Sequence, residues 1–185
     1  HPTFNIISVG RISPVKRNDL LINSLGSMIH ADPNIKYNIT VSFFGTPALK
    51  EQEEYARELQ TMAREFHVGK ILNFYGGVPN REIPQKLYDA DLFVNLSQTG
   101  SLDKAVLEAM ATGTLVLVSN PAFKGIVPDE LFISDDSPQA VGIKIRSLFD
   151  ATPTERTALI DKLYQEVKTN HDLKSLAHRI TSRYV

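Results

Sequence analysis

Four residues near the middle of the chain have the types and the spacing to bind an anion. Gly100 and Ser101 come shortly after an apolar run at 91–96, and Lys104 and Glu108 follow at a helical spacing. Gly100 lets a ligand approach the backbone, and Ser101 can cap a helix or donate a hydrogen bond. The free N–H groups of a helix start carry about half a positive charge, so Lys104 is unfavourable there by about 0.3–1 kcal/mol unless an anion lies nearby. A solvated Lys104–Glu108 pair on an ordinary helix explains the same residues equally well.

The elements around these residues predict where such an anion would lie. The apolar positions after Gly100 have the spacing of one helix face, Gly113 ends that helix, and 114–118 has the composition of a buried strand. The helix face consists of Leu102, Ala105, Val106, Ala109 and Met110. In such a strand–helix–strand unit the first loop lies at the carboxyl end of its strand and opens onto the helix start. We therefore expect the anion at this loop.

A second group of charged residues follows the first expected strand, at 4–10. The loop 10–18 contains three cations, Arg11, Lys16 and Arg17, and is shaped by a glycine and a proline. Arginine suits two-point contact with phosphate, and lysine suits contact as a point charge. A solvated basic turn is the alternative interpretation of this loop.

A resemblance to a known family becomes visible at Glu108. The run EAMATGTLVLV, which starts there, resembles the EAMAxGxPVI signature of the nucleotide-sugar-binding half of GT-B glycosyltransferases, in the large retaining family GT4, or glycosyl transferases group 1. In that family an E-x7-E pattern ends at this glutamate, which binds the ribose hydroxyls of the donor, and Glu108 matches it. The first glutamate would fall at Gly100, where this chain departs from the pattern. Asp103 is the nearest acid, and the resemblance leaves open whether it substitutes.

Other segments extend the resemblance. The loop GRISPVK resembles the family's GR(I/L)xxxK element, whose arginine and lysine grip the donor diphosphate and offset its charge in the transition state. This implies catalytic roles for Arg11 and Lys16. Phe44-Gly45-Thr46 fits the family's second glycine turn, and the residues of the third turn lie against the base in that family, although a packed turn is an equal alternative. The candidate donor-binding residues are Gly10, Gly45, Gly77, Val78, Pro79, Gly100, Ser101, Leu102, Asp103, Lys104 and Glu108.

Strand and helix patterns alternate through six units. This alternation predicts an α/β fold, a Rossmann-like open parallel sheet of about six strands in the order 3-2-1-4-5-6, with helices on both faces. No GxGxxG follows the first strand and no GxxxxGK(S/T) occurs, which weighs against a dinucleotide oxidoreductase and a P-loop nucleotidase. The strands are expected at 4–10, 37–45, 70–76, 91–96, 114–118 and 131–133, and the helices at 19–28, 48–67, 81–88, 102–110, 138–149, 153–168 and 173–184.

Composition narrows the class of protein further. A chain of 185 residues with 42% hydrophobic residues fits a single domain, 1–185, with a continuous core. The net charge of −1 argues against nucleic acid as a partner, and the absence of cysteine fits a cytoplasmic protein. No apolar run reaches the roughly 18–20 residues of a membrane span. The chain starts at His1-Pro2 without a methionine, so we expect a domain excised from a longer protein whose amino-terminal acceptor domain is absent.

Two groups of residues raise the question of a metal. Asp135 and Asp136 precede Ser137 and Pro138, and this arrangement favours a helix cap over a metal or acid–base pair. Histidines at positions 30, 67, 171 and 178 lack the spacing of metal ligands. No metal site is expected.

The leading hypothesis is the donor-binding half of a retaining glycosyltransferase. It would transfer a hexose from a UDP-, GDP- or ADP-sugar to a glycan, lipid-linked or other acceptor held by the absent domain, in the cytoplasm or peripherally at the cytoplasmic membrane face. Arg11, Lys16 and a helix terminus would neutralise the diphosphate, so no metal or other cofactor is required. The alternative is a non-catalytic Rossmann-like module for nucleotide binding or assembly, which the missing acid at Gly100 favours.

Overall fold

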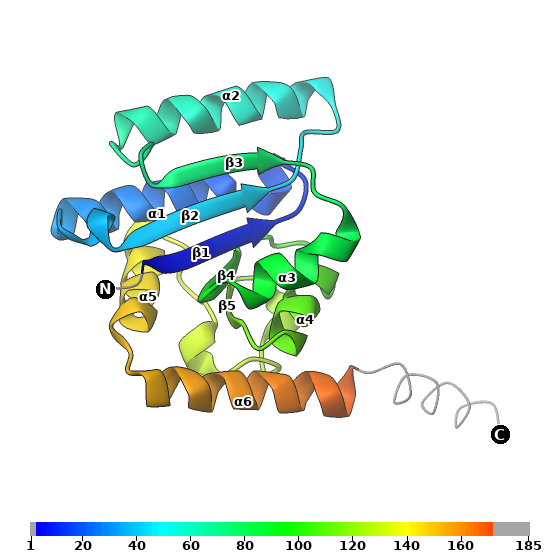
Figure 1. Cartoon of the computed structure of the whole chain (residues 1–185). Helices are drawn as coiled ribbons and strands as arrows, with labels where there is room; N and C mark the ends of the chain where they lie inside the picture. The colour runs from blue at the N-terminus through cyan, green and yellow to red at the C-terminus, as the bar shows by residue number, and fades with distance from the viewer. Residues whose placement is uncertain (1–2, 172–185) are drawn as a thin grey trace.

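A five-stranded parallel sheet forms the centre of the computed structural model, which describes residues 3–171 (Figure 1). The spatial order is β3-β2-β1-β4-β5, which agrees with the predicted order for these five strands. The strands are β1 (Phe4–Val9), β2 (Ile39–Phe44), β3 (Leu72–Gly76), β4 (Leu92–Asn95) and β5 (Leu115–Val118). The chain runs from β1 outward to β3 and then crosses back to place β4 on the other side of β1. The order in which successive strands are added therefore reverses between β1 and β4.

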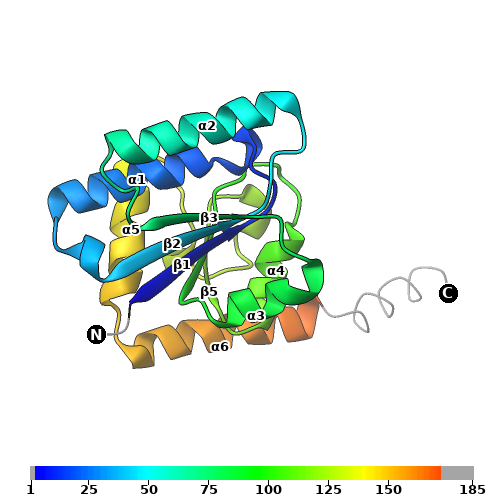
Figure 2. The ribbon, with the colours of Figure 1, turned by 45° about the horizontal axis from the view of Figure 1, so that its top comes forward.

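Helices cover both faces of this sheet, as the pattern predicts (Figures 1 and 2). Helix α1 packs against α2 and α5 on one side, and α4 packs against α3 and α6 on the other. The helices are α1 (Asn18–Ala31), α2 (Lys50–Glu65), α3 (Ile83–Tyr88), α4 (Lys104–Ala111), α5 (Pro138–Asp150) and α6 (Pro153–Asn170), with short 3-10 turns at η1 (Pro14–Lys16), η2 (Ile35–Tyr37), η3 (Asn80–Glu82), η4 (Pro121–Phe123) and η5 (Asp129–Leu131). All residues of β4 and β5 are buried, as expected for strands covered on both faces.

Strand register sets the position of the loops that follow the strands. Val9 pairs with Phe44, and Asn95 pairs with Val118. Both pairs stand at the carboxyl ends of their strands. The loops after β1 and β2 therefore begin side by side, as do the loops after β4 and β5.

The prediction of a sixth strand in the sheet is wrong. Segment 131–133 makes a single parallel bridge, between Phe132 and Val118, supported by the hydrogen bond from Ile133 N to Val118 O at 2.8 Å. Leu131 belongs to η5 instead. Three apolar residues between a turn and a helix cap are too few to extend the pairing. The helix expected at 173–184 lies outside the described residues.

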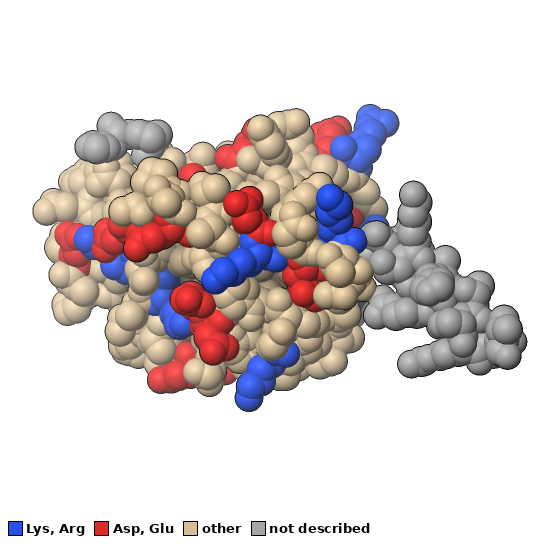
Figure 3. Space-filling view, turned by 90° about the horizontal axis from the view of Figure 1, so that it is seen from below, with Lys and Arg blue, Asp and Glu red and all other residues tan. Residues whose placement is uncertain are grey.

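Charge is mixed on the surface. Figure 3 shows acidic and basic side chains interspersed on the face that it presents, without an extended region of one sign among the coloured residues. Within residues 3–171, no helix combines the length and the apolar character needed to cross a bilayer.

Candidate functional site

Two glycines bring the ends of β1 and β2 into close contact. Gly45 has φ +149, and a Cβ at this position would collide with the carbonyl oxygen of Gly10. The amide of Gly10 donates to Phe44 O at 2.9 Å. Only glycine fits this approach, so these two residues of the predicted site are fixed by backbone packing. Their first role is to place the loop after β1 against the loop after β2.

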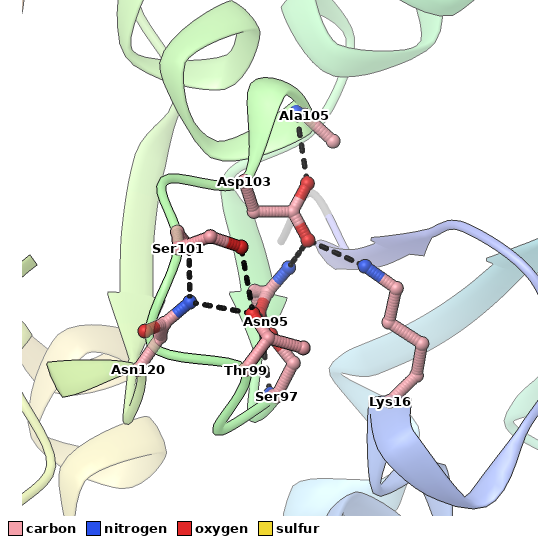
Figure 4. A network of polar contacts seen from close by, with 8 residues as sticks. All are labelled: Lys16, Asn95, Ser97, Thr99, Ser101, Asp103, Ala105 and Asn120. Carbon is pink, nitrogen blue, oxygen red and sulfur yellow. Dashed lines mark hydrogen bonds and ion pairs between the residues drawn. The ribbon is translucent and has the colours of Figure 1, made fainter. Parts of the chain in front are cut away.

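Lys16 extends back over this glycine pair from η1. Its amide donates to Ser13 O at 3.0 Å, and a Cβ on Gly10 would come within 3.0 Å of Lys16 Cε. The ammonium group donates to the carboxylate of Asp103, 87 residues further along the chain (Figure 4). The structure thus joins the predicted cationic loop after β1 to the predicted anion loop after β4.

The three cations of the loop after β1 have different surroundings. Arg11 is exposed and makes no hydrogen bond or ion pair with any other residue that the structure describes. Lys16 is paired with Asp103, and its side chain is 23% exposed. Arg17, in the left-handed conformation at φ 51, pairs with Asp136 at 2.5 Å. Arg11 is therefore the cation of this loop that is most accessible to a ligand.

Asp103 is the residue on which the polar network converges (Figure 4). It is the N-cap of α4 and accepts a hydrogen bond from the Ala105 amide at 3.1 Å. Its second oxygen accepts from Lys16 and from Asn95 Nδ2, the latter at 2.9 Å. Burial acts to raise the pKa of Asp103, but the hydrogen bonds from Lys16 and Asn95 outweigh it and hold the pKa below its usual value. Asp103 is accordingly a carboxylate at neutral pH.

This cap corrects one expectation for the anion loop. Helix α4 begins at Lys104, and the capping side chain is that of Asp103 rather than Ser101. Ser101 instead provides its carbonyl oxygen to Asn120 Nδ2 at 2.8 Å. Aspartate is among the strongest N-caps, and its charge also favours the positive end of the helix. The helix start predicted to attract an anion thus already holds one.

Two buried asparagines shape the loop and were missed from the sequence. Asn95, the last residue of β4, accepts from Ser97 N at 3.2 Å and from Ser97 Oγ at 2.7 Å. Asn120 follows β5 and accepts from Ala122 N at 3.0 Å. A polar residue at the end of a fully apolar run is the signal that could have identified both, because buried amides need partners.

A second ion pair ties the same loops to the segment before α5. Asp136 accepts from Arg17 and, at 2.8 Å, from Gln98 Nε2 in the loop after β4. The hydrogen bond from Arg17 lowers the pKa of Asp136 below its usual value. The predicted helix cap is confirmed, since Ser137 Oγ accepts from the Ala140 amide at 3.3 Å. No sequence motif indicated the contact between Asp136 and Arg17.

The remaining predicted residues lie along the same edge but outside this network. Glu108 Oε1 is 3.2 Å from Lys104 Nζ, with the two side chains 36% and 86% exposed. The surface pair considered from the sequence therefore exists. Gly77 follows β3, and a Cβ there would lie 3.6 Å from Thr46 Cγ2. Val78 packs against the core, and Pro79 precedes η3. At Gly100 a Cβ would meet no atom within 4 Å, and Leu102 is exposed.

The described residues 3–171 contain no group of metal ligands at this edge, and a cavity of about 990 Å³ in the domain lies elsewhere. Among residues 3–171, no three His, Cys, Asp or Glu side chains are grouped to hold a metal ion. The cavity lies between α5 and α6, and no predicted site residue lines it. The site that the sequence predicts is a polar edge rather than this cavity.

The protein is an open α/β domain. Polar residues gather at the carboxyl edge of its sheet, at the point where the strand order reverses, which is where open α/β domains bind ligands. The family model described as glycosyl transferases group 1 matches residues 2–174. The chain therefore belongs to that family, as its sequence motifs indicated.

Two solved structures share the fold of this chain. The C-terminal domain of a glycosyl transferase group 1 family protein, LpcC, from Francisella tularensis superposes with a TM-score of 0.80 at 21% identity, covering 93% of this chain and 88% of that one. HepE of Anabaena, solved with UDP and glucose, gives a TM-score of 0.81 at 19% identity and covers 98% of this chain and 48% of its own.

A curated relative supports the family at the level of sequence. D-inositol 3-phosphate glycosyltransferase 1 of Catenulispora acidiphila is 26% identical over 164 residues, which are 86% of this chain and 38% of the relative. The chain thus spans well under half the length of this relative.

Proposed function

We propose that this chain binds a nucleoside-diphosphate sugar at the carboxyl edge of its sheet and is the donor-binding half of a retaining glycosyltransferase. The observation that carries the proposal is the Lys16–Asp103 contact. It joins the loops after β1 and β4, the two strands between which the strand order reverses. Open α/β sheets bind their ligands at this switch point.

The predicted residues take distinct roles in this proposal. Arg11 and Lys16 face the diphosphate and stabilise the charge that develops on it as the sugar leaves. Glu108 accepts hydrogen bonds from the ribose hydroxyls, and Gly77, Val78 and Pro79 contact the base. The other residues of the predicted set, Gly10, Gly45, Gly100, Ser101, Leu102, Asp103 and Lys104, line the donor. The Anabaena protein was solved with UDP and with UDP-glucose, which supports a nucleotide-sugar donor.

The complete reaction requires more protein than this chain. In our proposal a hexose passes from a UDP-, GDP- or ADP-sugar to a glycan, lipid-linked or other acceptor. That acceptor is held by an amino-terminal domain across the cleft. The relatives are named as enzymes that glycosylate D-inositol 3-phosphate and mannosylate a dolichol-linked glycan, which supports transfer to soluble or lipid-linked acceptors. We place the reaction in the cytoplasm or at the cytoplasmic membrane face. We expect the 185-residue chain alone to bind donor but transfer no sugar.

A non-catalytic nucleotide-binding or assembly module is the second candidate. The observations that favour it are Gly100 in place of the family's first glutamate and the pairing of Glu108 with Lys104. Against it stands the retention of Arg11, Lys16 and Glu108 in one chain, because a decayed site has no need of all three.

A thermal-shift panel tests the proposed binding. Parent protein is heated with UDP, GDP, ADP and their sugars, and one set should stabilise it by RT ln(1 + [L]/Kd), about 2.7 kcal/mol at a hundredfold excess over Kd. Lys16→Ala should reduce that shift. Lys70→Ala is the matched control, since it removes an exposed lysine just before the amino end of β3, away from the proposed site at the carboxyl ends of the strands. A panel without any shift would contradict the proposal.

A further inference from the structure

Asp103 has a place in the site that the family resemblance does not assign to it. The missing acid of the E-x7-E pattern falls at Gly100, and Asp103 is the nearest carboxylate. Its two oxygens, however, already accept hydrogen bonds from Ala105 N, Asn95 Nδ2 and Lys16 Nζ (Figure 4). A carboxylate so occupied is poorly suited to bind a sugar hydroxyl in addition. Its contact with Lys16 indicates a different role.

The position of Asp103 is fixed independently of Lys16. The helix N-terminus holds one oxygen through the Ala105 amide, and the buried Asn95 holds the other. The side chain is 15% exposed. Because its pKa lies below the usual value, the group stays charged throughout the neutral range. A rigid negative charge therefore sits within hydrogen-bond distance of the lysine that the proposed function assigns to the diphosphate.

We propose that Asp103 is a resident anion that competes with the donor's diphosphate for Lys16, and that it weakens the binding of nucleoside diphosphates. The inference rests on the proposed function. The diphosphate must share the Lys16 ammonium with Asp103 or displace the carboxylate from it. The same competition favours release of the nucleoside diphosphate that remains after sugar transfer.

Asp103 has two opposing effects on diphosphate affinity, and their balance decides whether its removal tightens or weakens binding. It helps to order the lysine, but η1 and the glycine surface below the side chain also hold Lys16 in place. It also places a second negative charge beside the ligand, and like charges at one site oppose each other. Loss of the charge-assisted hydrogen bond from Lys16 to Asp103 leaves the ammonium free for the ligand, which corresponds to about tenfold in affinity. Removal of the charge should therefore tighten binding.

Asp103→Asn tests the proposal because asparagine is as good an N-cap as aspartate. Titration calorimetry on the 185-residue chain compares parent and variant with UDP, GDP and ADP and with uridine, guanosine and adenosine. We expect the diphosphate that the parent binds to bind the variant about tenfold more tightly, with the matching nucleoside unchanged. Asp103→Ser, which also retains a capping oxygen, should act in the same direction and serves if the first variant is unstable. Asp32→Asn is the matched control, since it removes a carboxylate paired with Arg146 at the end of α1, and its affinities should equal those of the parent.

The possible outcomes separate this inference from the proposed function. A parent that binds none of the three diphosphates contradicts the proposed function and removes the basis of the inference. If the parent binds one of them and Asp103→Asn binds it equally well or more weakly, the inference about Asp103 is overturned and the proposed function stands. Equal changes for diphosphate and nucleoside also overturn it, because they would indicate a purely structural effect on the loop.

Discussion

The two edges of the sheet both carry charged side chains, but these side chains lie in different surroundings. At the amino edge, Phe4 packs edge-on against Phe149 with ring centroids 5.6 Å apart, and the Arg156 guanidinium lies 4.8 Å from the centre of the Phe4 ring. The Asn5 amide at this edge donates to the Asp91 carboxylate at 2.7 Å. Aromatic and charged groups there meet one another in packed contacts. This edge contributes to stability.

At the carboxyl edge, Phe44 and Tyr75 stack with ring centroids 4.9 Å apart, and the loops that extend beyond the strands contain glycines and short polar residues. Lys16 and Arg17 reach carboxylates in other loops, and Arg11 is left exposed. In our proposal these polar loops serve to bind a ligand, whereas the contacts at the amino edge serve packing. Substitutions at the two edges should therefore change different measured quantities.

The largest effect is expected at the amino edge. Phe4 is 4% exposed, so Phe4→Ala should lower the free energy of unfolding by about 3–5 kcal/mol through lost burial and a cavity. Urea denaturation measures the change, and Phe4→Leu, which fills more of the space, should cost less. Nucleotide affinity of the folded protein should stay at the parent value. A parallel loss of affinity would show that the two edges are not separate in function.

Next in size are the cations of the carboxyl edge. Arg11→Ala and Lys16→Ala should each weaken nucleoside-diphosphate binding by about 1.5–3 kcal/mol, the value of a charge-assisted hydrogen bond. Binding of the nucleoside alone should hardly change, and calorimetry with both ligands measures the difference. Unchanged diphosphate affinity in both variants would favour a solvated basic turn.

Substitutions at Glu108 test whether this residue binds the ribose hydroxyls of the ligand or only pairs with Lys104. In the proposed site, Glu108→Gln weakens ribonucleotide binding and Glu108→Ala weakens it more. Loss of the 2′-hydroxyl should then reduce affinity in the parent and hardly at all in Glu108→Ala, a coupling of about 0.5–3 kcal/mol. If Glu108 serves only the surface pair with Lys104, the variants should lose about 0.3–0.5 kcal/mol of stability, and ribo and deoxy ligands should bind in the same ratio to all proteins.

The smallest effect is expected for Arg156 at the amino edge. Arg156→Met keeps much of the side-chain volume but removes the cation over the Phe4 ring and the hydrogen bond from Arg156 to Phe149 O at 2.6 Å, a combined loss of about 1–2 kcal/mol of stability. Thermal unfolding measures it, with Arg156→Lys as the control that retains the charge. A change in diphosphate affinity in Arg156→Met would contradict the separation of stability and ligand binding between the two edges.

Much of the fold was predictable because it depends on local patterns. Apolar runs ending at Gly10, Gly45 and Leu96 predicted strands, and helical spacing predicted the helices between them. The strand order was expected from the Rossmann-like pattern of alternating strands and helices. The prediction of a sixth strand was wrong because the apolar segment 131–133 is too short to pair with β5 beyond a single bridge.

The site was predictable in part. Arg11, Lys16 and Asp103 were identified as candidates from local motifs, and the structure joins Lys16 to Asp103 across 87 residues. Local motifs could not supply the partners of Arg17 or of Asn95, because those contacts depend on how separate loops meet at the sheet edge. The choice of Asp103 over Ser101 as the cap depended on where α4 begins, and helix boundaries are poorly defined by sequence pattern.

The central claim is that nucleotide binds at the carboxyl edge. The most direct test is to titrate the isotope-labelled chain with UDP, GDP and ADP while following its backbone amide resonances. We predict that one of these ligands shifts the amides of Gly10, Gly77 and Gly100 and leaves those of Ile143 and Leu159, which line the cavity between α5 and α6, unchanged. Shifts confined to Ile143 and Leu159 would contradict the claim and move the site to that cavity.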